Sequence, residues 1–103
     1  MIFQPHRFSR TAQLFEDFIK VLKKVDTLVL LDIYAASEKP IKGIDSRTIV
    51  ETLKQAGHKD IFYIKNHDEI INFINSRYLD FDVLITQGAG SVSAVCEKIK
   101  NKW

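Results

Sequence analysis

The chain has 103 residues, of which 46% are hydrophobic and 27% are charged, and its formal net charge at pH 7 is +2. This length is enough for one domain but not for two, so residues 1–103 are expected to form a single domain. A nearly balanced charge without a concentrated basic face argues against nucleic acid or an anionic membrane surface as a partner.

The remaining bulk features favour a cytoplasmic protein. The single cysteine, Cys96, excludes an internal disulfide and fits a reducing compartment. No apolar run in the sequence approaches the roughly 18 residues that cross a membrane. No signal peptide is visible, since the first three residues run directly into the polar segment 4–7.

The first half of the chain alternates short apolar runs with longer amphipathic ones. Ile2 and Phe3 are expected to end a strand whose beginning lies upstream. Residues 11–24 carry apolar side chains at steps of three and four, which predicts a helix with one buried face. Residues 27–33 form a continuous apolar run, typical of a central parallel strand covered on both faces. The apolar stripe of the predicted helix and the residue after it consists of Leu14, Phe15, Phe18, Ile19, Leu22 and Val25.

The second half repeats the alternation. A helix is expected at residues 46–56, with Gly57 as the left-handed residue at its end. A short strand follows at residues 61–64, and Asn66 with Glu69 resembles the capping box of a further helix. The last strand is predicted at residues 82–86, followed by a tight glycine turn with Ser91 as the cap of a final helix. The apolar face of that helix consists of Val92, Val95, Cys96 and Ile99.

This order predicts an α/β protein. Helices that separate strands force crossover connections, which produce a Rossmann-like three-layer domain with a mainly parallel sheet flanked by helices. The pattern leaves the order of the strands open. Ligands of such sheets gather beyond the carboxyl ends of the strands, so the loops at 4–10, 32–46 and 86–91 are expected to share one ligand-binding edge.

The first of these loops has the composition of an anion site. His6, Arg7 and Arg10 directly precede the predicted helix start, where backbone amides already favour an anion. Arginine adds a planar fork that matches a carboxylate or a phosphate. The alternative is that both arginines are solvated or paired with Glu16 or Asp17.

The other two loops are candidate ligand-edge or domain-interface segments. Gly88 and Gly90 belong to a turn that is either a plain tight turn or a backbone surface facing a ligand or a neighbouring domain. It lacks the lysine of a P-loop and follows the last strand instead of the first. The middle loop is long for a connection of this class, and long loops at this edge often carry function.

The middle loop contributes Tyr34, Glu38 and Asp45 as candidates, although Asp45 or Ser46 can instead cap the next helix. No Cys/His cluster has the spacing of metal ligands, and no Ser-His-Asp or Cys-His arrangement stands out. We therefore assign neither a catalytic residue nor a metal ligand.

Three segments together resemble a known family. Residues 3–11 read Phe-Gln-Pro-His-Arg-Phe-Ser-Arg-Thr, and residues 25–47 and 86–90 supply two further blocks in the same order. They resemble the UDP-N-acetylmuramate–L-alanine ligases, and the resemblance covers essentially the whole chain. It implies the C-terminal domain of a bacterial cytoplasmic enzyme of peptidoglycan biosynthesis.

The resemblance also implies an activity. In the family, the first domain binds the UDP-sugar, and the central domain carries the ATP site and the Mg²⁺ site. The C-terminal domain closes over the nucleotide and helps to hold L-alanine. ATP phosphorylates the muramoyl carboxylate, and the amine of L-alanine attacks the acyl phosphate. The matching residues, His6, Arg7 and Arg10, are then expected around L-alanine, with an arginine pairing to its carboxylate.

Part of the family's C-terminal domain has no counterpart in this sequence. An Asp-Asp-Tyr-x-His-His-Pro segment and a helix precede the first motif in the family. We therefore expect a domain that lacks its N-terminal portion, is inactive alone and holds no tightly bound cofactor. Its partners would be the missing N-terminal and central domains. The alternatives are the recycling ligase that attaches a tripeptide to the same sugar, a stand-alone anion- or nucleotide-binding module, and an interaction domain.

Overall fold

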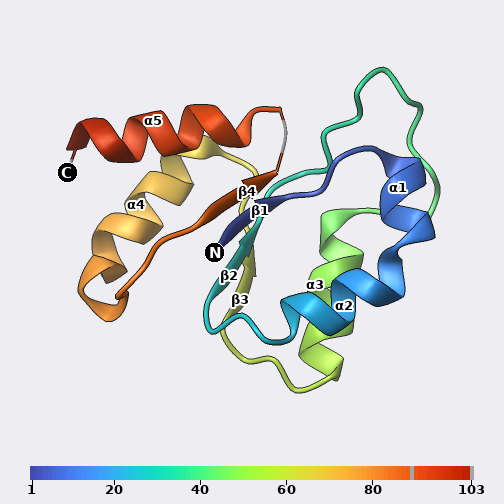
Figure 1. Ribbon diagram of the computed structural model, residues 1–103, viewed down its shortest axis with the longest axis horizontal. Coiled ribbons are helices and arrows are strands. Elements are labelled where there is room, and N and C mark those ends of the chain that lie inside the picture. Colours follow the sequence, from blue (N-terminus) through green and yellow to red (C-terminus); the bar gives the residue numbers. More distant parts are fainter. Residues whose placement is uncertain (89, 103) are drawn as a thin grey trace.

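The strands of the chain pair in parallel and form one sheet with the order β3-β2-β1-β4 (Figure 1). This computed structural model describes residues 1–88 and 90–102. The strands are β1 (Ile2–Gln4), β2 (Leu28–Leu30), β3 (Ile61–Tyr63) and β4 (Thr86–Gly88). The predicted α/β class with a parallel sheet is thereby confirmed, and the strand order, which the sequence left open, is defined.

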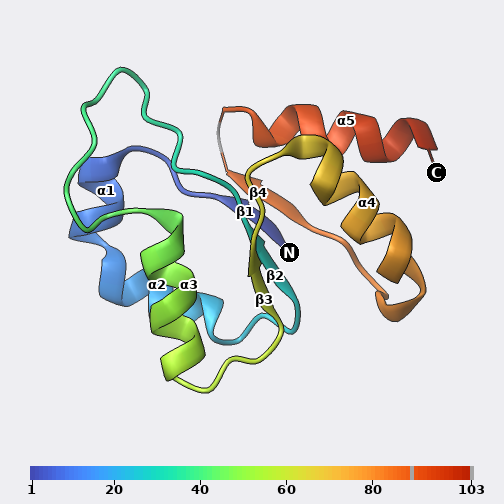
Figure 2. The same ribbon diagram turned by 180° about the vertical axis from the view of Figure 1, so that it is seen from behind.

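Helices cover both faces of the sheet and complete three layers (Figures 1 and 2). One face is covered by α2 and α3, and the other by α4 and α5. A short helix, α1, precedes α2, and a 3-10 turn follows α4. The helices are α1 (Phe8–Gln13), α2 (Phe15–Leu22), α3 (Ser46–Gln55), α4 (His67–Arg77) and α5 (Val92–Lys102), with the 3-10 turn at Tyr78–Asp80.

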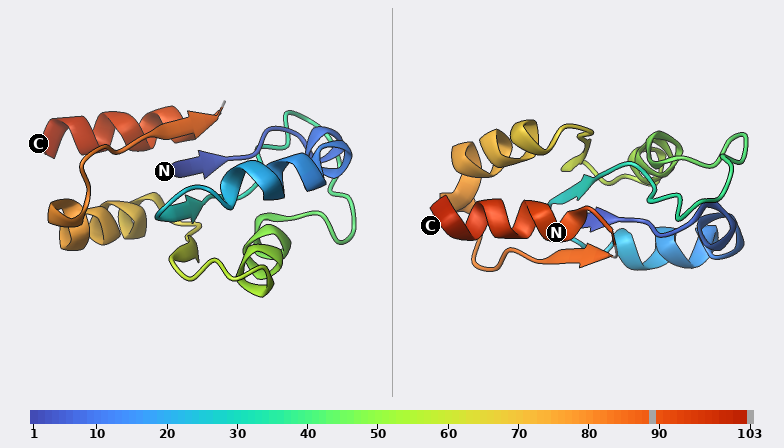
Figure 3. Two further views of the ribbon diagram at one scale, coloured as in Figure 1. Left: turned by 60° about the horizontal axis from the view of Figure 1, so that its bottom comes forward. Right: turned by 90° about the horizontal axis from the view of Figure 1, so that it is seen from above.

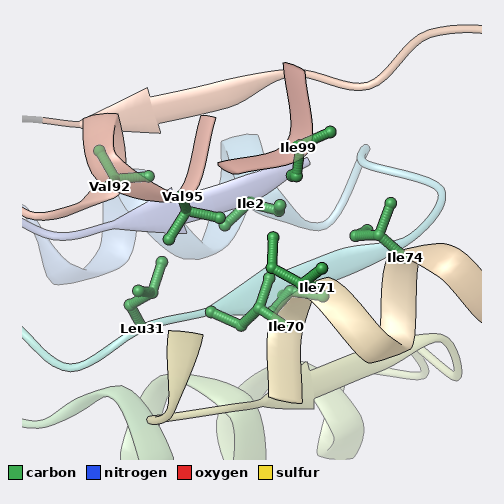
Figure 4. Packing of buried hydrophobic residues seen from close by; sticks show 9 residues of the cluster. Ile2, Leu31, Ile70, Ile71, Ile74, Val92, Val95 and Ile99 are labelled. Carbon is green, nitrogen blue, oxygen red and sulfur yellow. The ribbon is translucent and has the colours of Figure 1, made fainter. Parts of the chain in front are cut away.

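Neighbouring residues of each central strand point into different cores. Ile2 and Val29 belong to the core beneath α4 and α5, which is built mainly from isoleucine and valine (Figure 4). Phe3, Leu28 and Leu30 belong to the core beneath α2 and α3. The apolar run in β2 is therefore buried on both faces, as its unbroken hydrophobicity predicts.

The predicted helix over residues 11–24 is wrong in its extent, because the structure contains two helices. The first begins at Phe8, and the break falls at Leu14, whose backbone leaves the helical region (φ −106°, ψ 15°). The change of direction lets Phe15, Phe18 and Leu22 pack on the sheet, while Leu14 remains 38% exposed. Packing of the aromatic face on β1 thus takes precedence over helix continuity.

The fourth strand also differs from its prediction. It was expected at residues 82–86 but spans Thr86–Gly88. The physical reason is the position of the neighbouring strand β1. Ile2 pairs with Thr86, and the Ile2 amide donates to the carbonyl of Ile85. Residues before Ile85 therefore lie beyond the end of β1. Hydrophobic sequence alone does not make a strand where no neighbour offers hydrogen bonds.

The ends of α3 follow the predicted chemistry, whereas at the start of α4 the hydrogen bonds of the described residues include only the Asn66 half of the predicted capping box. Asp45 caps α3, since its Oδ1 accepts from the Thr48 amide at 2.8 Å. Gly57 follows α3 with φ +98°, the left-handed conformation expected there. Asn66 Oδ1 accepts from the amide of Asp68 at 2.8 Å in the first turn of α4.

Among the helices of the described residues, none combines the length and the apolar character that crossing a membrane requires.

An ion pair ties the end of α4 to the start of β3. Arg77 donates from two nitrogens to the two carboxylate oxygens of Asp60, at 2.9 and 2.8 Å. The Arg77 guanidinium also lies 5.2 Å from the centre of the Phe73 ring. The hydrogen bonds from Arg77, with a further one from Thr27, hold the pKa of Asp60 below its ordinary value of 3.8.

We expect this pair to make stability depend on pH. The folded-state pKa of Asp60 is lowered, so its contribution is present above pH 3.8 and is lost as the pH falls through the folded-state pKa. Arg77→Leu should lower the free energy of unfolding by about 1 kcal/mol at neutral pH. Urea unfolding at several pH values checks this. A deficit that stays constant below pH 3.8 would contradict it. Lys54→Leu, on the exposed face of α3, is the control.

Candidate functional site

The chain changes faces of the sheet at the carboxyl ends of β1 and β4. After β1 it continues into α1 and α2, whereas after β4 it continues into α5 on the opposite face (Figures 1 and 3). These two strands are neighbours in the sheet. Ligands of parallel α/β sheets bind in the crevice outside such a switch point. The segments that leave these strand ends are therefore the expected walls of a ligand site.

Gln4, the last residue of β1, joins both sides of the switch point. Its Nε2 donates to the Ser91 hydroxyl at 2.9 Å and to the carbonyl of Asp32 at 3.3 Å. Its Oε1 accepts from the Val92 amide, the first of α5, at 3.0 Å. The side chain is almost fully buried. One carboxamide thus links β1, the segment after β2 and the start of α5.

Gln4 is a residue that the sequence interpretation missed as a site component. The signal was available, because a glutamine within an apolar strand needs buried hydrogen-bond partners. The sequence did not reveal which partners those were. They lie up to 88 positions away in the chain.

Gly88 and Gly90, in the β4–α5 turn, lie so close to neighbouring residues that a side chain would not fit at either position. A Cβ on Gly88 would lie 2.4 Å from the Gln4 carbonyl oxygen, and a Cβ on Gly90 would lie 2.5 Å from the Tyr34 ring. Both glycines have positive φ, +135° and +95°. Ala89, which belongs to the predicted turn, lies outside the described residues. The glycines therefore let β1 and the middle loop pack directly against the turn.

His6 and Tyr34 form a stacked pair at this edge. Their ring centroids are 5.7 Å apart and their planes differ by 11°. Backbone hydrogen bonds fix the pair. The Arg7 amide donates to the Tyr34 carbonyl at 2.8 Å, and the Tyr34 amide donates to the Pro5 carbonyl at 2.9 Å. Together with Gly90 beneath Tyr34, three residues predicted from separate loops are in contact or adjacent.

Arg7 directly follows His6, whereas Arg10 lies in the last turn of α1 and does not precede the helix as predicted. Both side chains are exposed. Within the part of the chain that the structure describes, neither guanidinium forms an ion pair, so the alternative pairing with Glu16 or Asp17 is not observed. Arg7 has a positive φ of 67°, which is uncommon for a residue with a side chain. Both cations therefore face solvent, Arg7 next to the switch point and Arg10 on α1.

Glu38 connects the middle loop to the start of α1. Its Oε1 accepts from the Ser9 amide at 3.0 Å, and its Oε2 accepts from the Ser9 hydroxyl. These hydrogen bonds, and to a smaller extent the positive charge of Arg7, hold the pKa of Glu38 below its ordinary value. A carboxylate of the chain itself thus lies close to the predicted anion site.

Asp45 and Ser46 have structural roles. Asp45 Oδ1 accepts from both the amide and the hydroxyl of Thr48, so the capping interpretation is confirmed. The Ser46 hydroxyl is buried and donates to the carbonyl of Leu31. No hydrogen bond between described residues joins Asp45 to His6, Arg7 or Tyr34.

A second polar group, also missed from sequence, lies at the ends of β2 and β3. The Tyr63 hydroxyl donates to Asp32 Oδ1, and the Arg47 guanidinium lies 5.2 Å from the centre of the Tyr63 ring. Burial, and then the hydrogen bond to Asp32, raise the pKa of Tyr63. In residues 1–88 and 90–102, no three His, Cys, Asp or Glu side chains are grouped as a metal site would require.

A cavity of about 410 Å³ lies at the opposite edge of the sheet. Its lining includes Met1, Thr27 and Ile85, which precede the amino ends of three strands. The candidate residues leave the carboxyl ends and do not line this cavity. We place the candidate site at the carboxyl edge, because the change of faces and the converging polar groups occur there.

No known protein-family model matches the chain. The fold and the site therefore define a structural class, a three-layer parallel α/β domain with a polar switch point between β1 and β4.

Replacing Gln4 by leucine should destabilise the fold through the Val92 amide. The substitution preserves approximate size but leaves that buried donor without its acceptor, which costs about 1–3 kcal/mol. Equilibrium urea unfolding measures the loss. The control is Gln13→Leu, an exposed position of α1, for which little change is expected. Equal stability of the two variants would show that the Gln4 carboxamide does not hold the switch point.

Proposed function

We propose that the chain is the C-terminal domain of the ATP-dependent ligase that joins L-alanine to UDP-N-acetylmuramate. The observation that supports this most is the meeting of all three family-like segments at one switch point. His6 stacks on Tyr34, and Tyr34 packs on Gly90, so each segment contributes one of these residues. Such convergence suits a shared ligand edge.

In this proposal, Arg7 and Arg10 attract the carboxylate of L-alanine. A guanidinium offers two parallel N–H donors to a carboxylate. The exposed position of both side chains leaves their donors accessible to an incoming anion. His6, fixed by its stack on Tyr34, forms a firm side of the same site. The contribution of the chain is to orient the amino acid, so we assign it no catalytic residue.

The chemistry in the proposal requires the rest of the ligase. ATP and Mg²⁺ would be held mainly by the central domain, and UDP-N-acetylmuramate by the first domain. The amine nitrogen of L-alanine attacks the carbonyl carbon of the muramoyl phosphate, and inorganic phosphate leaves as the amide forms. The intact enzyme would act in the bacterial cytoplasm, in peptidoglycan biosynthesis.

The chain alone is expected to bind L-alanine weakly and to form no product with UDP-N-acetylmuramate and ATP. Amide shifts in a nitrogen-15 NMR titration with L-alanine should concentrate at residues 6–11, because the carboxylate meets the arginines there. Detectable ligation would contradict the incompleteness of the site. Tight binding of a nucleotide would instead favour the stand-alone binding module.

Arg10→Ala in the intact ligase should reduce kcat/KM for L-alanine about ten- to a hundred-fold. A hydrogen bond to a charged group contributes about 1.5–3 kcal/mol, and its loss appears in kcat/KM. Lys20→Ala, on the exposed face of α2, is the matched control and should leave alanine kinetics unchanged. A preference of the intact enzyme for a tripeptide over L-alanine would identify the recycling ligase instead.

A further inference from the structure

Strained backbone is concentrated around a single contact. Among the described residues, the non-glycine residues with positive φ are Arg7 (67°), Ala36 (50°) and Ser37 (74°). Arg7 lies two positions before Ser9, and Ala36 and Ser37 directly precede Glu38. Residues with a Cβ rarely adopt this conformation, and they retain it only where surrounding structure enforces it. Both partners of the Ser9–Glu38 contact are therefore flanked by strain.

The loop that carries Glu38 has little else to hold it. We call residues 35–45 the strap; it projects beside α1 in Figure 1. No strap residue is buried, so no hydrophobic core fixes it. A tight turn, closed by the Glu38 amide donating to the Ala35 carbonyl at 3.0 Å, positions the glutamate at α1. Both carboxylate oxygens then bind Ser9.

We propose that Glu38 is a latch that holds the strap against the β1–α1 loop in a strained conformation, and that release of its carboxylate lets the strap open. Release lets Ala36 and Ser37 relax to ordinary backbone angles, so the strain favours opening. The inference concerns the conformation of the chain and does not depend on the proposed ligase reaction.

Two events can release the latch. Protonation removes the charge of Glu38; since Ser9 holds the pKa of this carboxyl below its ordinary value of 4.5, the latch holds above that pH and opens as the pH falls through the lowered pKa. Arg7 is the charged group that faces Glu38 from the adjoining loop. The attraction from Arg7 is the smallest contribution to this lowered pKa, so an external carboxylate that binds Arg7 should favour opening only slightly.

Amide hydrogen exchange of the 103-residue chain, followed by NMR, tests the latch. The reporters are the amides of Ser9 and Glu38, which are hydrogen-bonded when the latch is closed. Glu38→Gln should speed their exchange about ten-fold, as expected when a hydrogen bond to a charged group is lost. Glu51→Gln, on the exposed face of α3, is the matched control. Unchanged exchange in Glu38→Gln, with α3 amides intact, would overturn the latch.

A glycine substitution tests the strain separately. Glycine adopts positive φ without steric cost, so Ser37→Gly should favour the closed strap and slow exchange of the Glu38 amide several-fold. Lys39 does not have a positive φ, so Lys39→Gly adds backbone flexibility without relieving strain. It should therefore speed exchange of the Glu38 amide. If Ser37→Gly speeds exchange as much as Lys39→Gly does, the strap stores no strain and the proposal fails.

Discussion

The arrangement of the carboxyl edge depends on the side-chain amide of Gln4. At the carboxyl ends of β1 and β4 the chain leaves to opposite faces of the sheet, so a crevice forms outside these ends. Gln4 links the two sides through Ser91 and Val92, and it reaches the segment after β2 through Asp32. The stacked pair and the glycine turn are then held on one rigid platform, which is how a site keeps its geometry.

The sequence carried the layer architecture, because alternating helix and strand periods force parallel crossovers. The sequence did not indicate where β4 begins and ends. The strand exists only where residues 86–88 pair with residues 2–4 of β1, and a pairing between segments so far apart in the chain leaves no trace in local hydrophobicity. The break at Leu14 escaped prediction for a related reason, since helical spacing continues through it and only packing on the sheet interrupts it.

The candidate site was predictable to the level of loops. Carboxyl ends of parallel strands share one edge, so His6, Tyr34 and Gly90 could be expected near one another. The individual hydrogen-bond partners could not be predicted, because they depend on side-chain geometry between distant positions. Gln4 and Ser91 are 87 positions apart, and Ser9 and Glu38 are 29 positions apart. Asp45 illustrates the opposite case, since its cap is local and visible three residues away.

The side-chain links at the centre of the molecule differ in chemical type from those at its periphery. Gln4 joins the strands at the centre with a carboxamide, which has no charge to lose between acid and neutral solution. The peripheral links at Glu38 and Asp60 are carboxylates that require ionisation to hold their partners. Acid is therefore expected to weaken the links at Glu38 and Asp60, whereas the hydrogen bonds of the Gln4 carboxamide do not depend on pH in this range.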